Sequence, residues 1–330
     1  MADAGAGPTF PLGSWPTPLE EAPRLAAAIG LAPGDLWIKR DDLSGLGGGG
    51  NKVRKLEWTI GDAIAQGADT VVTTGAPQSN HARLTAAAAA RAGLDAVLVL
   101  AGRPERAGSG NLALAGLFGA RVVWAGDVTH EDLAEAAREV AGDLRAAGAV
   151  PALIPFGGSS VLSARGYVEC GRELLRQAPD LHDVVVAVGS GGTMAGLVAA
   201  LGAERVLGVD CGALDDPAPV VAALAAPVGP VAVEAGRLRI RREQVGAGYG
   251  ELTEPVARAL DIAGHTEGIP LDPIYTGRAL AGLIAAVADG SVAPGRKTIF
   301  LHSGGLPGLF GHPGAVAHAE AGLHAMPPRS

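Results

Sequence analysis

The sequence predicts an α/β fold in which helices cover a largely parallel sheet. Short β-branched runs alternate with alanine-rich runs along most of the chain, and this alternation is typical of βαβ units. The composition allows a large packed core, because 48% of the 330 residues are hydrophobic and only 18% are charged. Polar or glycine-rich turns follow several of the apolar runs, at the sheet edge where such folds bind their ligands.

The expected elements alternate between strand and helix from residue 69 to residue 209, and a last strand follows at 297–301. Each expected strand is a short apolar run, and each expected helix is a longer run rich in alanine. The strands cover residues 69–73, 96–100, 121–124, 152–155, 183–188, 205–209 and 297–301. The helices cover residues 83–91, 111–118, 131–147, 161–175 and 193–201. Because parallel strands need such crossovers, the order predicts helices on the faces of the sheet.

Charge and hydropathy exclude several classes of protein. The net charge is −8 and no basic run occurs, so we expect no nucleic-acid partner. The most apolar stretch, residues 84–100, is interrupted by Arg91 and Asp95, so we expect no membrane span. The first twenty residues lack the pattern of a signal peptide, and two cysteines cannot build a disulfide framework. These features favour a cytoplasmic protein.

Three of the turns carry the candidate chemistry. Gly75–His81 follows the strand at 69–73, Gly189–Thr193 follows the strand at 183–188, and His302–Gly305 follows the last strand. Each turn is polar or rich in glycine and leads into a helix. Since the carboxyl ends of parallel strands meet at one edge, the three turns are expected to line a single cleft.

The turn Gly189–Thr193 is a candidate phosphate site. Glycines let backbone N–H groups approach an anion, and the start of the following helix favours negative charge. A tight strand-to-helix turn with no ligand is the plainer interpretation. A dinucleotide-binding turn is a further alternative: Met194 stands where the third glycine is required, but Asp210 ends the next strand as that motif demands. No P-loop lysine follows.

The glycine run Gly47–Gly50 precedes Asn51 and Lys52. Glycines permit close approach of the backbone to a ligand, and a lysine at the start of a helix can serve as a nucleophile. Taken alone, a lysine after glycines is more often a solvated side chain.

The third candidate is the turn around Ser79, Asn80 and His81. Ser79 and Asn80 stand at a helix start, where they are expected as caps, and the same position suits a substrate carboxylate. His81 has no evident partner, so a position on the helix surface or a supporting role is as well founded as catalysis. No Ser-His-Asp arrangement and no metal-ligand spacing is present, and we expect no metal.

Taken together, these segments resemble the pyridoxal-phosphate enzymes of the tryptophan-synthase-β type, known as fold type II. Within that group they resemble the family of D-cysteine desulfhydrase and 1-aminocyclopropane-1-carboxylate deaminase. The matching segments run in order over almost the whole chain: Pro16–Leu19, Ile38–Asp42, Gly49–Glu57, Gln78–His81, Gly157–Ser160, Gly166–Glu169, Gly189–Thr193, Gly246–Gly250, Asp272–Gly277 and His302–Gly305.

The resemblance implies how pyridoxal 5'-phosphate would be held. Lys52 would form the Schiff base with the aldehyde of the cofactor, and Asn80 would bond its 3-hydroxyl group. Lys55 would hold the phosphate together with the glycine-rich turn, which consists of Gly189, Ser190, Gly191, Gly192 and Thr193.

The resemblance also implies roles toward the substrate, a small amino acid. Ser79 would bind its carboxylate, and Tyr249 and Tyr275 would close over it. Thr276 and Ser303 would lie near the pyridine nitrogen of the cofactor.

The implied architecture has two three-layer αβα domains with largely parallel sheets. Residues 1–52 and 157–330 would form the large, cofactor-binding domain, and residues 53–156 a smaller inserted domain. A homodimer is implied as well.

The substrate is predicted from two of these positions. The deaminase pattern has Glu directly after the tyrosine and Leu before the paired glycines, where this chain has Thr276 and Ser303. Two hydroxyls favour a desulfhydrase acting on D-cysteine, although desulfhydrases usually have Thr where this chain has Ser303. An L-cysteate sulfo-lyase and the cyclopropane deaminase remain as alternatives, with a nicotinamide-dependent Rossmann oxidoreductase as an alternative of another class.

Overall fold

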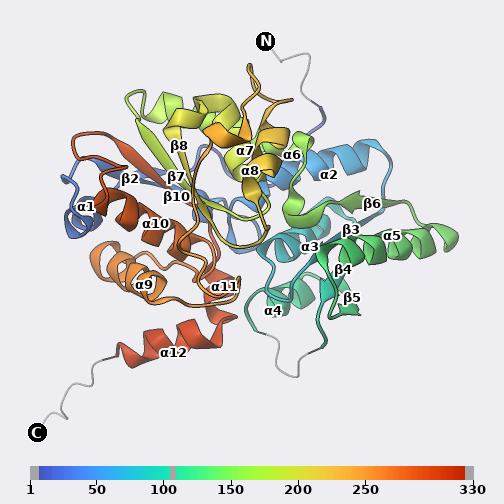
Figure 1. The fold of residues 1–330 in the computed structure, drawn as a ribbon. Helices are drawn as coiled ribbons and strands as arrows, with labels where there is room; N and C mark the ends of the chain where they lie inside the picture. Colours follow the sequence, from blue (N-terminus) through green and yellow to red (C-terminus); the bar gives the residue numbers. More distant parts are fainter. Residues whose placement is uncertain (1–6, 105–108, 324–330) are drawn as a thin grey trace, which may run out of the picture.

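The structure is a computed structural model that describes residues 7–104 and 109–323, and two sheets form its frame (Figure 1). All neighbouring strands are parallel except β1 and β2, which are antiparallel. The six-stranded sheet has the order β1 (Leu19–Glu21), β2 (Leu36–Arg40), β10 (Thr298–His302), β7 (Asp183–Val188), β8 (Val206–Asp210), β9 (Arg239–Arg241). The four-stranded sheet has the order β5 (Arg121–Gly126), β4 (Asp95–Ala101), β3 (Thr70–Gly75), β6 (Pro151–Ile154).

Helices cover both faces of each sheet, so that each sheet is the middle of three layers. The six-stranded sheet packs on one face against α1 (Pro23–Ile29), α9 (Glu254–Glu267) and α10 (Thr276–Ala288). Its other face packs against α6 (Val161–Gln177), α7 (Gly192–Leu201) and α8 (Pro217–Ala225). The four-stranded sheet lies between α5 (His130–Ala146) on one face and α2 (Lys52–Ala65), α3 (Asn80–Ala92) and α4 (Gly110–Leu117) on the other.

Two short helices, α11 (Leu306–Phe310) and α12 (Pro313–Ala321), follow the last strand. In the described part of the chain, no helix is both long and apolar enough to cross a membrane.

The predicted fold class is confirmed. Every predicted strand and helix is present, and the observed ends differ from the predicted ones by a few residues at most. The sequence did not reveal β2, because Lys39 and Arg40 make its end look like a surface segment. In fact Lys39 is fully buried. The strands of the four-stranded sheet lie between residues 70 and 154, inside the range predicted for the smaller domain. The domain limits themselves stay a prediction.

A buried ionic network fixes the start of α2. Arg54 donates to Asp41 at 2.9 Å and to Glu173 at 3.0 Å, and Glu173 also pairs with Lys39. The Tyr167 hydroxyl donates to Asp41 at 2.6 Å. Burial alone would raise the pKa of Asp41, but the charge of Arg54 and these hydrogen bonds outweigh it and hold the pKa below its usual value. The network joins β2, α2 and α6.

We predict that Asp41→Asn lowers the free energy of unfolding by about 3 kcal/mol, because the buried Arg54 guanidinium loses one of its two carboxylate partners. The other partner, Glu173, is already shared with Lys39. Since the pKa of Asp41 is lowered in the folded state, this contribution is present at neutral pH and is lost as the pH falls through that pKa. Urea unfolding at pH 7 and at acid pH measures both effects. The control Glu135→Gln breaks an exposed pair with Arg138 and should cost less than about 1 kcal/mol. Equal losses in the two variants would contradict the role of the network.

Candidate active site

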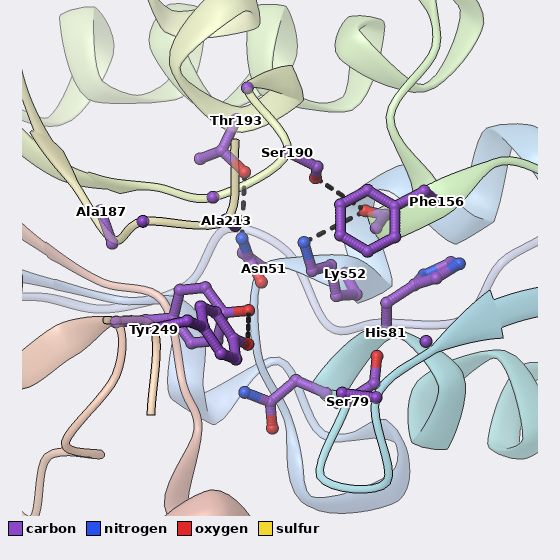
Figure 2. A pocket seen from close by; sticks show the side chains of 18 of the residues that line it. Asn51, Lys52, Ser79, His81, Phe156, Ala187, Ser190, Thr193, Ala213 and Tyr249 are labelled. Carbon is purple, nitrogen blue, oxygen red and sulfur yellow. Dashed lines mark hydrogen bonds between the residues drawn. The ribbon is translucent and has the colours of Figure 1, made fainter. Parts of the chain in front are cut away.

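One cavity lies between the two sheets, at the carboxyl ends of β3, β7 and β10 (Figure 2). All three polar turns of the sequence contribute to its lining, as predicted. The predicted site residues that line it are Lys52, Ser79, Asn80, Gly189, Ser190, Gly191, Thr193, Tyr249, Tyr275 and Ser303. Lys55, Gly192 and Thr276 are not part of the lining itself.

The glycine run places Lys52 in this cavity. All four glycines from Gly47 to Gly50 have positive φ, which only glycine adopts readily. A Cβ on Gly49 would lie 1.8 Å from the backbone oxygen of Asp42, so the turn has no room for a side chain. Directly after the run, the backbone N–H of Asn51 donates to the carbonyl of Ser303 at 2.9 Å. The run therefore brings the start of α2 against the end of β10.

Two lysine amines meet at one carbonyl. Lys52 Nζ and Lys55 Nζ donate to the backbone oxygen of Gly157 at 3.1 and 2.7 Å, and Lys55 also donates to Ser159 Oγ at 2.7 Å. Burial lowers the pKa of Lys52 to about 8. Burial and the charge of Lys52 lower the pKa of Lys55 well below its usual value. Lys52 is thus not the solvated side chain of the alternative interpretation.

The turn between β7 and α7 forms a cradle beside these amines. Gly191 has φ of +84°, and a Cβ on Gly192 would lie 2.7 Å from Ser159 Oγ and 3.2 Å from Lys55 Nζ. Ser159 Oγ is 2.7 Å from Ser190 Oγ and accepts from the N–H of Gly192 at 3.2 Å. The backbone can therefore approach closely to an anion held at the start of α7, as the sequence predicts.

Ser79 both caps α3 and lines the cavity, so neither of its two interpretations excludes the other. Its Oγ accepts from the N–H of Ala82 at 3.1 Å. Figure 2 shows Ser79 across the cavity from Ser190 and Thr193. Asn80 begins the helix, and its Oδ1 accepts from Arg83 at 3.3 Å.

His81 is buried in the cavity wall, and the surface position considered for it is wrong, because it is only 2% exposed. Its Nε2 lies 2.9 Å from Thr73 Oγ1, whose own proton is donated to the carbonyl of Ile154 at 2.8 Å. Nε2 must therefore carry the ring proton. Burial and the nearby lysine charges lower the pKa of His81 well below its usual value, so the ring is neutral at neutral pH. Its Nδ1 is then an acceptor with no partner among the described residues.

Tyr249 and Tyr275 contact each other in another part of the cavity lining. Their hydroxyls are 2.5 Å apart and their rings meet edge to face. Burial raises the pKa of Tyr249 to about 12 and that of Tyr275 well above its usual value, so both hydroxyls keep their protons at neutral pH. Gly189 leaves room for Tyr275, since a Cβ there would lie 3.0 Å from its ring.

The two hydroxyls predicted to lie near the pyridine nitrogen differ in position. Ser303 lines the cavity, whereas Thr276 is fully buried and its hydroxyl donates to Asp272 at 2.7 Å. Asp272 also accepts the N–H groups of Ile274, Tyr275 and Thr276, and so caps α10. A role of Thr276 toward the cofactor therefore stays a prediction.

Several residues of the site were not singled out from the sequence. Asn51 Nδ2 donates to Thr193 Oγ1 at 3.0 Å and ties the lysine turn to the cradle. Ser159 lies within the Gly157–Ser160 segment, so only the family pattern pointed to it. The side of the cavity formed by the four-stranded sheet is an apolar wall, which consists of Ala101, Val128, His130, Leu133 and Phe156. Its members lie at the end of β4, in the loop before α5, on the first turn of α5 and at the start of a short 3-10 helix, where side-chain direction is not evident from sequence.

The chain matches the model of the family described as "Pyridoxal-phosphate dependent enzyme" over residues 11–304. It belongs to that family. A protein of Pyrococcus abyssi, provisionally named a 1-aminocyclopropane-1-carboxylate deaminase, is 41% identical over 92% of this chain and 93% of its own length. The D-cysteine desulfhydrase of Klebsiella pneumoniae (strain 342) is 39% identical over 90% and 94% of the two chains. A solved structure described as an ACC deaminase homologue superposes with a TM-score of 0.85 at 37% identity, covering 94% and 96%.

The cofactor of the family is pyridoxal phosphate, and the cavity fits it. The cradle of Gly189–Thr193 would hold the phosphate group beside Lys55, and Lys52 would present its amine to the aldehyde. No carboxylate is among the described residues that line the cavity, so a dianionic phosphate meets no like charge. The nicotinamide alternative is not supported by the family match, and Asp210 bonds the N–H of Gly212.

We predict that Gly192→Ala weakens the binding of pyridoxal phosphate to the cofactor-free protein by tenfold or more, because its Cβ would collide with Ser159 and Lys55. A titration followed by the absorption of the cofactor measures the affinity. The control Gly142→Ala adds a Cβ on helix α5 where nothing lies within 4 Å. It should leave the affinity unchanged and stabilise the helix by about 0.5–1 kcal/mol. An unchanged affinity in Gly192→Ala would show that the cradle does not hold the phosphate.

Proposed function

We propose that this chain is a D-cysteine desulfhydrase, a carbon–sulfur lyase that converts D-cysteine and water into pyruvate, hydrogen sulfide and ammonia. The observation that carries the proposal is the lack of acidic groups in the cavity: its described lining presents the Ser303 hydroxyl and no carboxylate. An acidic partner would be needed to keep the pyridine nitrogen protonated. Without one, the chemistry must rely on a good leaving group such as a thiolate.

When bound, pyridoxal phosphate supplies an electron sink for the α-carbon of an amino acid. Lys52 supplies the base. With its pKa lowered to about 8, about a tenth of its amine is unprotonated at pH 7, compared with well under a thousandth for an ordinary lysine. Lys52 Nζ therefore takes up the α-proton.

The β-carbon to sulfur bond then breaks, and the electron pair leaves with the sulfur. Tyr249 and Tyr275 keep their protons at neutral pH. Because one of the two hydroxyls donates to the other, the second keeps its proton free to donate a hydrogen bond to the departing thiolate. The three-carbon enamine that remains takes up water and yields pyruvate and ammonia.

The apolar wall favours D-cysteine over L-cysteate as the substrate. A sulfonate keeps its negative charge at every physiological pH and costs much free energy when buried without a cation. Ala101, Val128, Leu133 and Phe156 offer no cation, and the His130 ring packs at a tilt against Phe156 with ring centroids 4.5 Å apart. A small thiol side chain meets no such cost.

The second candidate is 1-aminocyclopropane-1-carboxylate deaminase, because the relative at 41% identity carries that name. Its substrate has no leaving group, and the family pattern for it has Glu and Leu where this chain has Thr276 and Ser303. The lack of carboxylates in the described lining therefore favours the desulfhydrase.

A substrate panel tests the proposal. We expect the holoenzyme to release sulfide and pyruvate from D-cysteine faster than from L-cysteine, and to release little from L-cysteate. We also expect little 2-oxobutyrate from the cyclopropane amino acid. Lys52→Ala is the matched inactive control. Turnover of the cyclopropane acid alone would overturn the desulfhydrase proposal and with it the argument from the lining.

A further inference from the structure

Arg83 is a buried cation that none of the roles above uses. It lies on α3, one turn after Ser79, and is only 1% exposed. Burial lowers its pKa to about 10, so it stays charged at neutral pH. Its hydrogen-bond partners in residues 7–104 and 109–323 are all neutral amide oxygens. A buried guanidinium without a carboxylate is costly, which calls for an explanation.

The guanidinium joins three segments around the cavity. It donates to the backbone oxygens of Gly47 and Gly49 in the glycine run, the latter at 3.3 Å. It donates to the Oδ1 of Asn111 at 2.9 Å and to the Oδ1 of Asn80 at 3.3 Å. Arg83 thus connects the turn that carries Lys52 with the turn that carries Ser79 and Asn80.

These bonds determine which way Asn80 presents its amide. Its Oδ1 is directed to Arg83, so its Nδ2 is left to donate to a ligand in the cavity. Asn111 strengthens the arrangement, because its Nδ2 donates to the backbone oxygen of Gln78 at 2.9 Å. The turn from Gln78 to Asn80 is therefore held from behind by a positive charge and presents donors in front.

The field of Arg83 acts on whatever binds at this turn. The side chain lies directly behind Asn80, in a region that excludes water and screens charge poorly. The described lining offers no carboxylate to neutralise it. An anion at the Ser79–Asn80 turn would supply the missing negative charge, whereas a neutral ligand would not.

We propose that Arg83 is a positioning residue that makes the Ser79–Asn80 turn selective for the carboxylate of an amino-acid substrate. The proposal rests on the proposed function in one respect only, that the substrate is an amino acid. The guanidinium provides the charge and orients the Asn80 amide, whose Nδ2 the family pattern assigns to the 3-hydroxyl of the cofactor. The carboxylate binds to Ser79 and the neighbouring donors of the turn without touching Arg83.

The test compares two ligands that differ only in the carboxylate. Alanine, used as either enantiomer, has no leaving group on its β-carbon, and ethylamine is alanine without the carboxylate. Binding of each to the holoenzyme is followed by the change in the absorption of the cofactor. The ratio of the two dissociation constants measures the preference for a carboxylate, and a general loss of structure weakens both ligands alike and leaves the ratio unchanged.

Asn111→Asp replaces the amide that Arg83 contacts with a carboxylate. Its matched control Asn111→Leu removes the side-chain hydrogen bonds of Asn111 without adding a charge. We expect the preference for alanine to fall about tenfold in Asn111→Asp and in Arg83→Met, and to stay within about threefold in Asn111→Leu. Where Arg83→Met fails to fold, Asn111→Asp decides.

An unchanged ratio in folded Asn111→Asp would overturn the proposal, as would a wild-type enzyme without preference for alanine over ethylamine. Failure of the desulfhydrase proposal looks different: no sulfide is released from D-cysteine, while the ratio and its response to Asn111→Asp persist.

Discussion

The close approach of two backbones at the bottom of the cavity is the constraint on which the rest of the site depends. Gly50 and Gly304 pass each other so closely that a Cβ on Gly304 would lie 2.6 Å from the Cα of Gly50. The N–H of Asn51 bonds the carbonyl of Ser303 at the same place. Because both residues lack a side chain, the two backbones can touch, and the start of α2 lies against the end of β10. Lys52, on the first turn of α2, therefore lies beside the cradle that follows β7.

Charge is the second organising feature. The cavity brings together Lys52, Lys55 and, behind one wall, Arg83, while the described lining holds no carboxylate. Buried cations raise the free energy of the protein unless anions accompany them. A phosphate at the cradle and a carboxylate at the Ser79–Asn80 turn would supply that charge at the two ends of the site. The same lack of acids would leave the cofactor ring without an acidic partner, and the proposed elimination of a good leaving group rests on this.

The sequence revealed the parts of the site that short motifs of neighbouring residues make recognisable. The glycine-rich turns after β3, β7 and β10 were visible because parallel strands bind ligands at their carboxyl ends. The tautomer of His81 was not visible, since it depends on Thr73 and on the Ile154 carbonyl, which are close only in the fold. The bond between Thr276 and Asp272 was hidden for the same reason. Long-range contacts between separate segments are the information that spacing along the chain does not contain.

The most direct test of the account is to locate the covalent bond to the cofactor. Treating the holoenzyme with borohydride fixes pyridoxal phosphate to the lysine that holds it, and peptide mass spectrometry then identifies that lysine. The account predicts the modification on Lys52, whose amine has a lowered pKa and faces the cavity. Modification of Lys55 instead, or of no lysine in the cavity, would contradict it.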